Sequence, residues 1–201
     1  MTPSLRTQRL RLAWVLALPF ILLARPTLLS LGVGGLVSLP GLVLRGVASG
    51  FIFKDRSLAR HGPFGYLRHP LYLGSFFAGL GLALASGRWV VVGGFLVLFP
   101  WVYLRTIRAE EAELELRFGE AYRIYRGQVP AFLPRLGRRP KPEESRTSLP
   151  FPPGACGPEG SAPGEIRSFH PEMFRRNRGW EAALGVWAGL LLLWLRMRYL
   201  P

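Results

Sequence analysis

The chain has 201 residues, of which 49% are hydrophobic, and its formal net charge at pH 7 is +14. Such a positive charge could bind nucleic acid, but here the basic residues flank long apolar segments, which is the arrangement of a membrane protein. A nucleic-acid partner is therefore not expected, and the single cysteine, Cys156, excludes a disulfide within the chain.

Three stretches of the chain are nearly free of charge: residues 12–53, 71–104 and 180–197. Most ionisable residues fall instead between 105 and 178. Because a helix needs about 20 mostly apolar residues to cross a bilayer, this pattern favours an all-α fold. We expect a polytopic membrane helical bundle with about five transmembrane helices.

The first two spans are expected at about residues 10–24 and 33–53. Three arginines, Arg6, Arg9 and Arg11, lie before or at the start of the first span, which could also be the apolar region of a signal peptide. The sequence before Pro26 is a poor cleavage site, so an uncleaved span is favoured. Arg45 lies inside the second span, where it could reach the membrane interface or face the bundle interior near a ligand.

The third and fourth spans, at about 70–86 and 89–104, should form a hairpin because only a tight turn separates them. Pro70 suits the first position of a helix, where its missing N–H would have no partner within the helix. Small residues in the third span should allow close helix packing. They are Gly74, Ala78, Gly79, Gly81, Ala83 and Ala85.

The rest of the chain alternates between helical and irregular sequence. An interfacial helix is expected at 105–126, and a flexible cytoplasmic linker rich in proline and glycine at 137–168. A basic segment and a C-terminal transmembrane helix complete the chain at 169–201. Residues 1–136 are therefore expected to form the core domain.

The positions of lysine and arginine predict the orientation. With the N-terminus in the cytoplasm, 21 of these residues lie on the cytoplasmic side and 4 on the outer side. The positive-inside rule therefore predicts a cytoplasmic N-terminus and an outer C-terminus, and we expect a bacterial inner membrane. The segment that opens the third span then faces the cytoplasm.

Two polar segments meet at that cytoplasmic end. The first, residues 61–74, places Arg68 and His69 at a helix start, where free N–H groups and the helix dipole favour an anion. The second is Glu110 and Glu111, just beyond the fourth span. This acidic stretch could instead be a solvated helix face with ordinary ion pairs.

A ligand with an anionic end and a cationic or hydroxylated part would fit between these segments. S-adenosylmethionine has a carboxylate, an amine, ribose hydroxyls and an adenine that could stack on Tyr66 or Tyr72. Other zwitterions would also fit, and the residues alone do not choose among them.

The order Arg68-His69-Pro70-x-Tyr72-x-Gly74, then Glu110-Glu111, then Phe118-Gly119-x-x-Tyr122, resembles a known pattern. It is similar to that of the integral-membrane methyltransferases of the isoprenylcysteine carboxyl methyltransferase and phospholipid methyltransferase group. The resemblance covers about residues 40–136 and implies S-adenosylmethionine bound on the cytoplasmic side, with an acceptor that arrives from the membrane.

The resemblance also implies roles for particular residues. The cofactor pocket would be lined by Arg68, His69, Tyr72 and one or both of Glu110 and Glu111, with Tyr66 and Pro70 beside them. Methyl transfer is an in-line displacement that needs alignment rather than a covalent enzyme intermediate. Arg108, or Arg45 if it faces inward, could orient an acidic acceptor, and Glu110 could serve an amine. No metal ion is expected.

Several alternatives remain open. The acceptor could be a prenylated cysteine, a phospholipid amine, a quinone-like lipid or a small thiol, and the oligomeric state is not indicated. The hairpin also resembles that of membrane steroid or isoprenoid reductases, which use NADPH. A non-enzymatic scaffold whose basic face recruits anionic lipid or a partner is a further possibility.

Overall fold

The computed structural model describes residues 20, 22–52, 58–132 and 169–199. Over these residues the protein has six α-helices, one short 3₁₀ helix and no strand, which confirms the predicted all-α class for the part described. Most of the expected first span at 10–24 and the whole linker at 137–168 lie outside the described residues.

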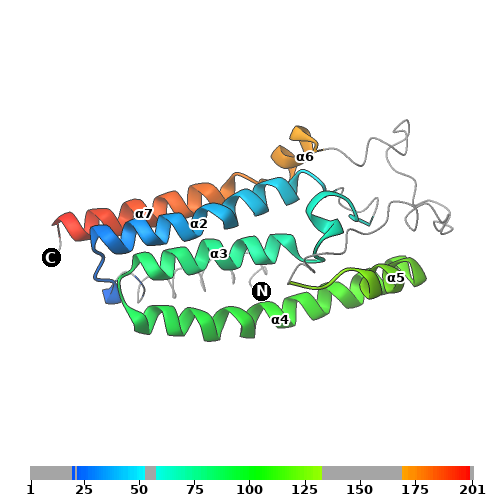
Figure 1. Cartoon of the computed structure of the whole chain (residues 1–201), viewed down its shortest axis with the longest axis horizontal. Helices are drawn as coiled ribbons and strands as arrows, with labels where there is room; N and C mark the ends of the chain where they lie inside the picture. Colours follow the sequence, from blue (N-terminus) through cyan, green and yellow to red (C-terminus); the bar gives the residue numbers. More distant parts are fainter. Residues whose placement is uncertain (1–19, 21, 53–57, 133–168, 200–201) are drawn as a thin grey trace, which may run out of the picture.

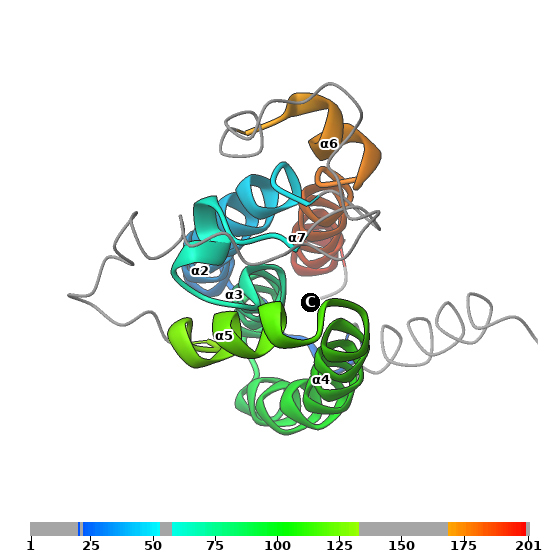
Figure 2. The same ribbon diagram turned by 90° about the vertical axis from the view of Figure 1, so that its right-hand side faces the viewer.

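Four long helices run side by side. They are α2 (Leu28–Ser49), α3 (Pro70–Ala85), α4 (Trp89–Phe118) and α7 (Glu181–Tyr199). In Figure 1, and in the end-on view of Figure 2, α2 and α7 lie on one side of α3 and α4 lies on the other. The helix α3 is therefore the centre of the bundle, and its first residue, Pro70, lies where the sequence predicted a helix start.

The helix α2 begins earlier than the expected span at 33–53. Its start is fixed by a reciprocal cap, in which the Ser30 amide donates to Thr27 Oγ1 and the Thr27 amide donates to Ser30 Oγ. Gly32, Gly34 and Gly35 lie inside this helix, and Gly34 packs against the backbone of α3 at Gly81.

Glycine pairs hold α2 and α3 at close range. A Cβ atom at Gly41 would lie 2.6 Å from the carbonyl oxygen of Gly74, and one at Gly74 would lie 2.7 Å from that of Gly41. The predicted small-residue face is confirmed for Gly74, Ala78, Gly81 and Ala85, which pack against α2, and Ala83 is buried as well. Gly79 instead faces the ring of Phe95 on α4.

This packing gives a first prediction. Replacing Gly74 by valine should lower the free energy of unfolding by about 1–3 kcal/mol, because the added atoms must force two backbones apart. Thermal unfolding in detergent checks it. The matched control is Gly93→Val on α4, where a Cβ meets nothing within 4 Å, so a larger loss there than at Gly74 would contradict the packing argument.

The helix α4 differs from its predicted division into a span ending at 104 and an interfacial helix at 105–126. It continues unbroken for 30 residues, because the charged segment after Leu104 consists of good helix formers. It ends only at Gly119, whose φ of +52° favours glycine. A second helix, α5 (Glu120–Gln128), then turns back beside the end of α4.

Two helices, α2 and α4, are long and apolar enough to cross a membrane, and α3 is a shorter apolar helix. Only 17% of the α2 window and 11% of the α4 window is buried, whereas the core helix of a soluble protein would be mostly buried. Large apolar side chains such as Trp89 and Leu29 are exposed along them. Five spans and their orientation remain predictions.

The C-terminal segment is anchored to the end of α2. The short helix α6 (Pro171–Arg176) is followed by Asn177, whose Nδ2 donates to the carbonyl oxygens of Ser49 and Ile52 at 2.9 and 2.8 Å. These bonds satisfy carbonyl groups that the end of a helix leaves without partners. The part of the chain after the linker therefore fixes the backbone that leads from α2 toward the polar end of the bundle.

Candidate functional site

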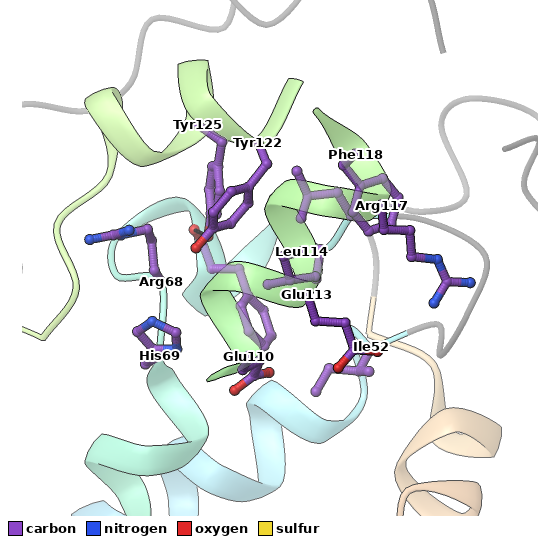
Figure 3. Close-up of a pocket in the computed structure, with 13 residues that line it drawn as sticks. Ile52, Arg68, His69, Glu110, Glu113, Leu114, Arg117, Phe118, Tyr122 and Tyr125 are labelled. Carbon is purple, nitrogen blue, oxygen red and sulfur yellow. Dashed lines mark hydrogen bonds between the residues drawn. The ribbon is translucent and has the colours of Figure 1, made fainter. Parts of the chain in front are cut away.

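A cavity of about 270 Å³ lies where α3 begins and α4 ends. Its walls come from the end of α2, the loop before α3, the last turns of α4, and α5 (Figure 3). The polar lining residues include Arg68, His69 and Glu110, and the apolar ones include Ile52 and Phe64. The two segments that the sequence analysis expected to meet therefore share one cavity.

The loop before α3 is held from both sides. The 3₁₀ helix (Gly62–Gly65) buries Phe64, and the Phe64 carbonyl oxygen accepts a hydrogen bond of 2.8 Å from the Tyr125 hydroxyl. Gly62 has a φ of +60° and lies against the Phe51 ring, so this turn favours glycine. The chain before α3 is thus fixed to α5 across the cavity.

The backbone amides beside the motif are already used. The Arg68 amide donates to the Pro130 carbonyl at 2.8 Å, and the His69 amide donates to that of Ala131 at 3.2 Å. Neither amide is open to an anionic ligand. An anion near the start of α3 would therefore need the side chains of Arg68 and His69 or amides further along the helix.

Glu111 joins the motif to α4 through contacts with two arginines and with His69. Its Oε1 lies 2.7 Å from Arg68 Nη1 and 3.0 Å from His69 Nε2, and its Oε2 lies 4.0 Å from Arg126 Nη2. The Arg68 and His69 side chains are only 12% and 4% exposed, so the carboxylate balances charge in a largely buried place. Glu111 therefore positions these two side chains rather than facing the cavity.

Glu110, in contrast to Glu111, faces the cavity and has a carboxylate oxygen without a hydrogen-bond partner in the described part of the chain. It lines the cavity, on the side nearest to α2 and α3, and its Oε2 is buried with no hydrogen-bond partner among the residues that the structure describes. The same holds for Arg68 Nε. Buried polar atoms are normally hydrogen-bonded, so these two atoms indicate a place for a ligand or water with both donors and acceptors.

Two buried tyrosines of α5 form an apolar wall of the cavity. Tyr122 and Tyr125 are buried together with Val129, and Leu58, Leu114 and Phe118 pack against them. Burial raises the pKa of Tyr125 far above the usual phenol range. Burial, and then the nearby Glu111 carboxylate, also raise the pKa of Tyr122. Both hydroxyls therefore keep their protons at neutral pH, and that of Tyr125 donates to the Phe64 carbonyl oxygen.

The other candidate residues from the sequence lie outside the cavity lining. Tyr66 is 55% exposed. The Tyr72 ring lies between those of His69 and Tyr103, at centroid distances of 5.8 and 5.4 Å. Pro70 is buried as the first residue of α3, and Arg108 is exposed on α4. Their roles at the cofactor or the acceptor remain predictions.

Sequence reasoning did not assign site roles to Tyr122, Tyr125 and Arg126. The spacing of the two tyrosines indicated a helix face against the bundle, but not that this face closes a cavity. For Arg126 the sequence offers no local signal, because its contact with Glu111 depends on how α5 turns back after Gly119.

Residues 41–121 match the family model described as phospholipid methyltransferase. In the same region the chain is 36% identical over 81 residues to the protein-S-isoprenylcysteine O-methyltransferase of Schizosaccharomyces pombe. The predicted family resemblance is confirmed for this segment. The phospholipid methyltransferase segment contains Arg68, His69, Glu110 and Glu111, whereas most of α5 and all of α6 and α7 lie beyond it.

Two further relatives of this segment have different names. The cobalt-zinc-cadmium resistance protein CzcN of Cupriavidus metallidurans is 34% identical over 83 residues, and the nickel-cobalt-cadmium resistance protein NccN of Alcaligenes xylosoxydans xylosoxydans is 32% identical over 83 residues. The three matches cover 40–41% of this chain and 34–38% of the relatives' own lengths. No solved structure matches the chain.

Proposed function

We propose that this protein is an integral-membrane methyltransferase that moves a methyl group from S-adenosylmethionine to a lipophilic acceptor. The observation that carries the proposal is the buried, unpaired carboxylate oxygen of Glu110, which shares a cavity with Arg68 and His69 at the polar end of an apolar bundle. The family segment contains all three residues.

The residues present suit this cofactor. S-adenosylmethionine carries two positive groups, one carboxylate and several hydroxyls, and the cavity offers a free carboxylate oxygen and the Arg68 Nε donor. Glu110 would face a positive group, while Arg68 and His69 would face the carboxylate. The cavity of about 270 Å³ is close to the smaller ligand pockets of proteins, which begin at about 300 Å³.

The chemistry needs alignment and exclusion of water. The acceptor atom attacks the methyl carbon, the bond from carbon to sulfur breaks, and its electron pair stays on the sulfur. Holding the two reactants in line lowers the barrier by several kcal/mol without a covalent enzyme intermediate. The apolar wall of Tyr125, Val129 and Phe118 would keep water from the reacting atoms.

We also place the cavity at the cytoplasmic face of the membrane. The basic residues of the sequence support this orientation, because most of them belong to the segments on the cavity side of the proposed spans. The acceptor would then enter from the bilayer beside α3. The relative from Schizosaccharomyces pombe is named for an isoprenylcysteine, so S-farnesylcysteine is the first acceptor to test.

Equilibrium binding to the purified protein tests the proposed cofactor. We expect S-adenosylmethionine and its product S-adenosylhomocysteine to bind, and NADPH not to bind. Isothermal titration in detergent measures all three. Binding of NADPH in place of S-adenosylmethionine would instead support a membrane reductase, and binding of neither would support a scaffold.

A further inference from the structure

An exposed stripe of three side chains lies on α4 where the apolar part of this helix ends. The α4 stripe consists of Trp101, Arg105 and Arg108, all of which are exposed. Residues 89–104 carry no charge, so Arg105 is the first charged residue after the proposed span. The Arg105 guanidinium carbon lies 4.6 Å from the centre of the Trp101 ring, a cation–π contact on the outside of the helix.

The α4 stripe lies on the side of the helix that is turned away from the cavity. Successive residues of an α-helix are about 100° apart around its axis. Counted from Glu110, which lines the cavity, Arg105 and Arg108 are about 140° and 200° away. Trp101 is about 180° away by the same count. In Figures 1 and 2, α4 forms the edge of the described bundle with α3 on its inner side, so the stripe faces outward.

The two arginines of the stripe have no acidic partner on this face. They are three residues apart, and like charges that are neighbours on a helix surface repel each other. No ion pair joins either of them to a carboxylate within the described part of the chain. Glu111, three residues after Arg108, contacts Arg68 and Arg126 instead. An anion from outside the chain would relieve the repulsion.

The place of the stripe along α4 favours a lipid phosphate as this anion. Tryptophan is enriched at the boundary between membrane and water, and Trp101 is 57% exposed there. The arginines that follow it then lie at the level of the headgroups, where the planar fork of a guanidinium can make two parallel hydrogen bonds to a phosphate. A zwitterionic lipid also has a phosphate, but its ammonium group would be repelled by the two guanidinium groups.

We propose that the α4 stripe binds the headgroup of an anionic phospholipid, with the phosphate on Arg105 and Arg108 and the start of the acyl chains against Trp101. The inference rests on the membrane placement of α4 and not on the cofactor or the acceptor. Because Glu110 follows Arg108 by two residues, a lipid bound here fixes the depth at which the cavity end of α4 meets the membrane.

Quenching of tryptophan fluorescence by brominated lipids tests the proposal on the full chain in nanodiscs. The chain has six tryptophans, so the same measurement on Trp101→Phe isolates the signal of Trp101. Brominated phosphatidylglycerol and brominated phosphatidylcholine with identical acyl chains are compared. We expect the anionic lipid to occupy the place beside Trp101 about fivefold or more in preference, since each arginine near a membrane surface strengthens the attraction of anionic lipid by about that factor. A ratio near one would overturn the proposal.

Variants then assign the preference to the arginines of the stripe. In the double variant Arg105→Gln/Arg108→Gln the ratio at Trp101 should fall close to one, and an unchanged ratio would overturn the proposal. The matched control is Arg175→Gln/Arg176→Gln, which removes two exposed arginines from α6 at the same end of the bundle (Figure 1). It should leave the ratio nearly unchanged. Equal losses in the two double variants would show that general surface charge, and not the α4 stripe, attracts the lipid.

Two other occupants give different results in the same experiment. A second copy of the chain seated on the stripe would shield Trp101 from both brominated lipids, and absence of quenching by either lipid would overturn the proposal. Inorganic phosphate at millimolar concentration should not displace the anionic lipid, and displacement would show a site for small anions instead. No arm uses S-adenosylmethionine or an acceptor, so failure of the proposed function and failure of this inference are separate results.

Discussion

Replacing Glu111 by alanine should destabilise the folded protein by about 3–5 kcal/mol, because it leaves Arg68 and His69 largely buried without their shared carboxylate. The loop before α3 should then lose its fixed position, and binding of S-adenosylmethionine should fall with it. Thermal unfolding in detergent, followed by titration of the cofactor at a temperature where the variant is folded, measures both effects.

The matched control is Glu115→Ala, one helical turn further along α4. Glu115 pairs with Arg123 at 2.7 Å, but the Arg123 side chain is 63% exposed, so removing the Glu115 carboxylate should cost much less stability than removing that of Glu111. Equal effects at the two positions would contradict the positioning role of Glu111. A stable Glu111→Ala protein with normal cofactor affinity would remove Glu111 from the site altogether.

Replacing Glu110 by glutamine should have the opposite signature. The affinity for S-adenosylmethionine should fall by about tenfold or more, because a charge-assisted contact to a positive group of the cofactor is lost. The stability of the free protein should hold or rise, since Oε2 is buried without a partner in the part of the chain described, and a neutral amide is easier to bury. Titration and thermal unfolding of the same preparation measure the two changes.

Glu120→Gln provides the control for Glu110, because the Glu120 side chain is 72% exposed on α5 and its one ion pair within the described part of the chain, with Arg123, is as long as 3.8 Å. It should change neither affinity nor stability appreciably. If Glu110→Gln destabilised the protein and left cofactor affinity unchanged, then Glu110 would be a structural residue. The two adjacent glutamates would then have exchanged the roles given to them.

This division between adjacent glutamates shows what the sequence could and could not provide. The start of α3 at Pro70 followed from the chemistry of proline, and the meeting of its loop with the acidic segment followed from the hairpin. Neighbouring residues on a helix point about 100° apart, so one of the pair had to face elsewhere. Which one faces the cavity depends on Arg68, His69 and Arg126, and Arg126 is brought near only by the turn at Gly119.

Two other differences arise from packing between helices. The glycines at 32, 34 and 35 have low helix propensity, but α2 runs through them, and Gly34 packs closely against α3. The backbone amides of Arg68 and His69 donate to the carbonyl oxygens of Pro130 and Ala131, which are more than sixty residues away in the chain. Fewer backbone amides are therefore free to bind an anion at the start of α3 than the local sequence indicates. Such contacts carry no local signal.

The most direct test of the central claim is methyl transfer itself. Nanodiscs with the wild-type protein are incubated with radiolabelled S-adenosylmethionine and N-acetyl-S-farnesylcysteine, and the lipid-soluble fraction is counted beside that of Glu110→Gln. The account predicts label in this fraction with the wild-type protein and at least tenfold less with the variant at limiting cofactor. Absence of label from every lipid and small-molecule fraction, together with no binding of the cofactor, would contradict it.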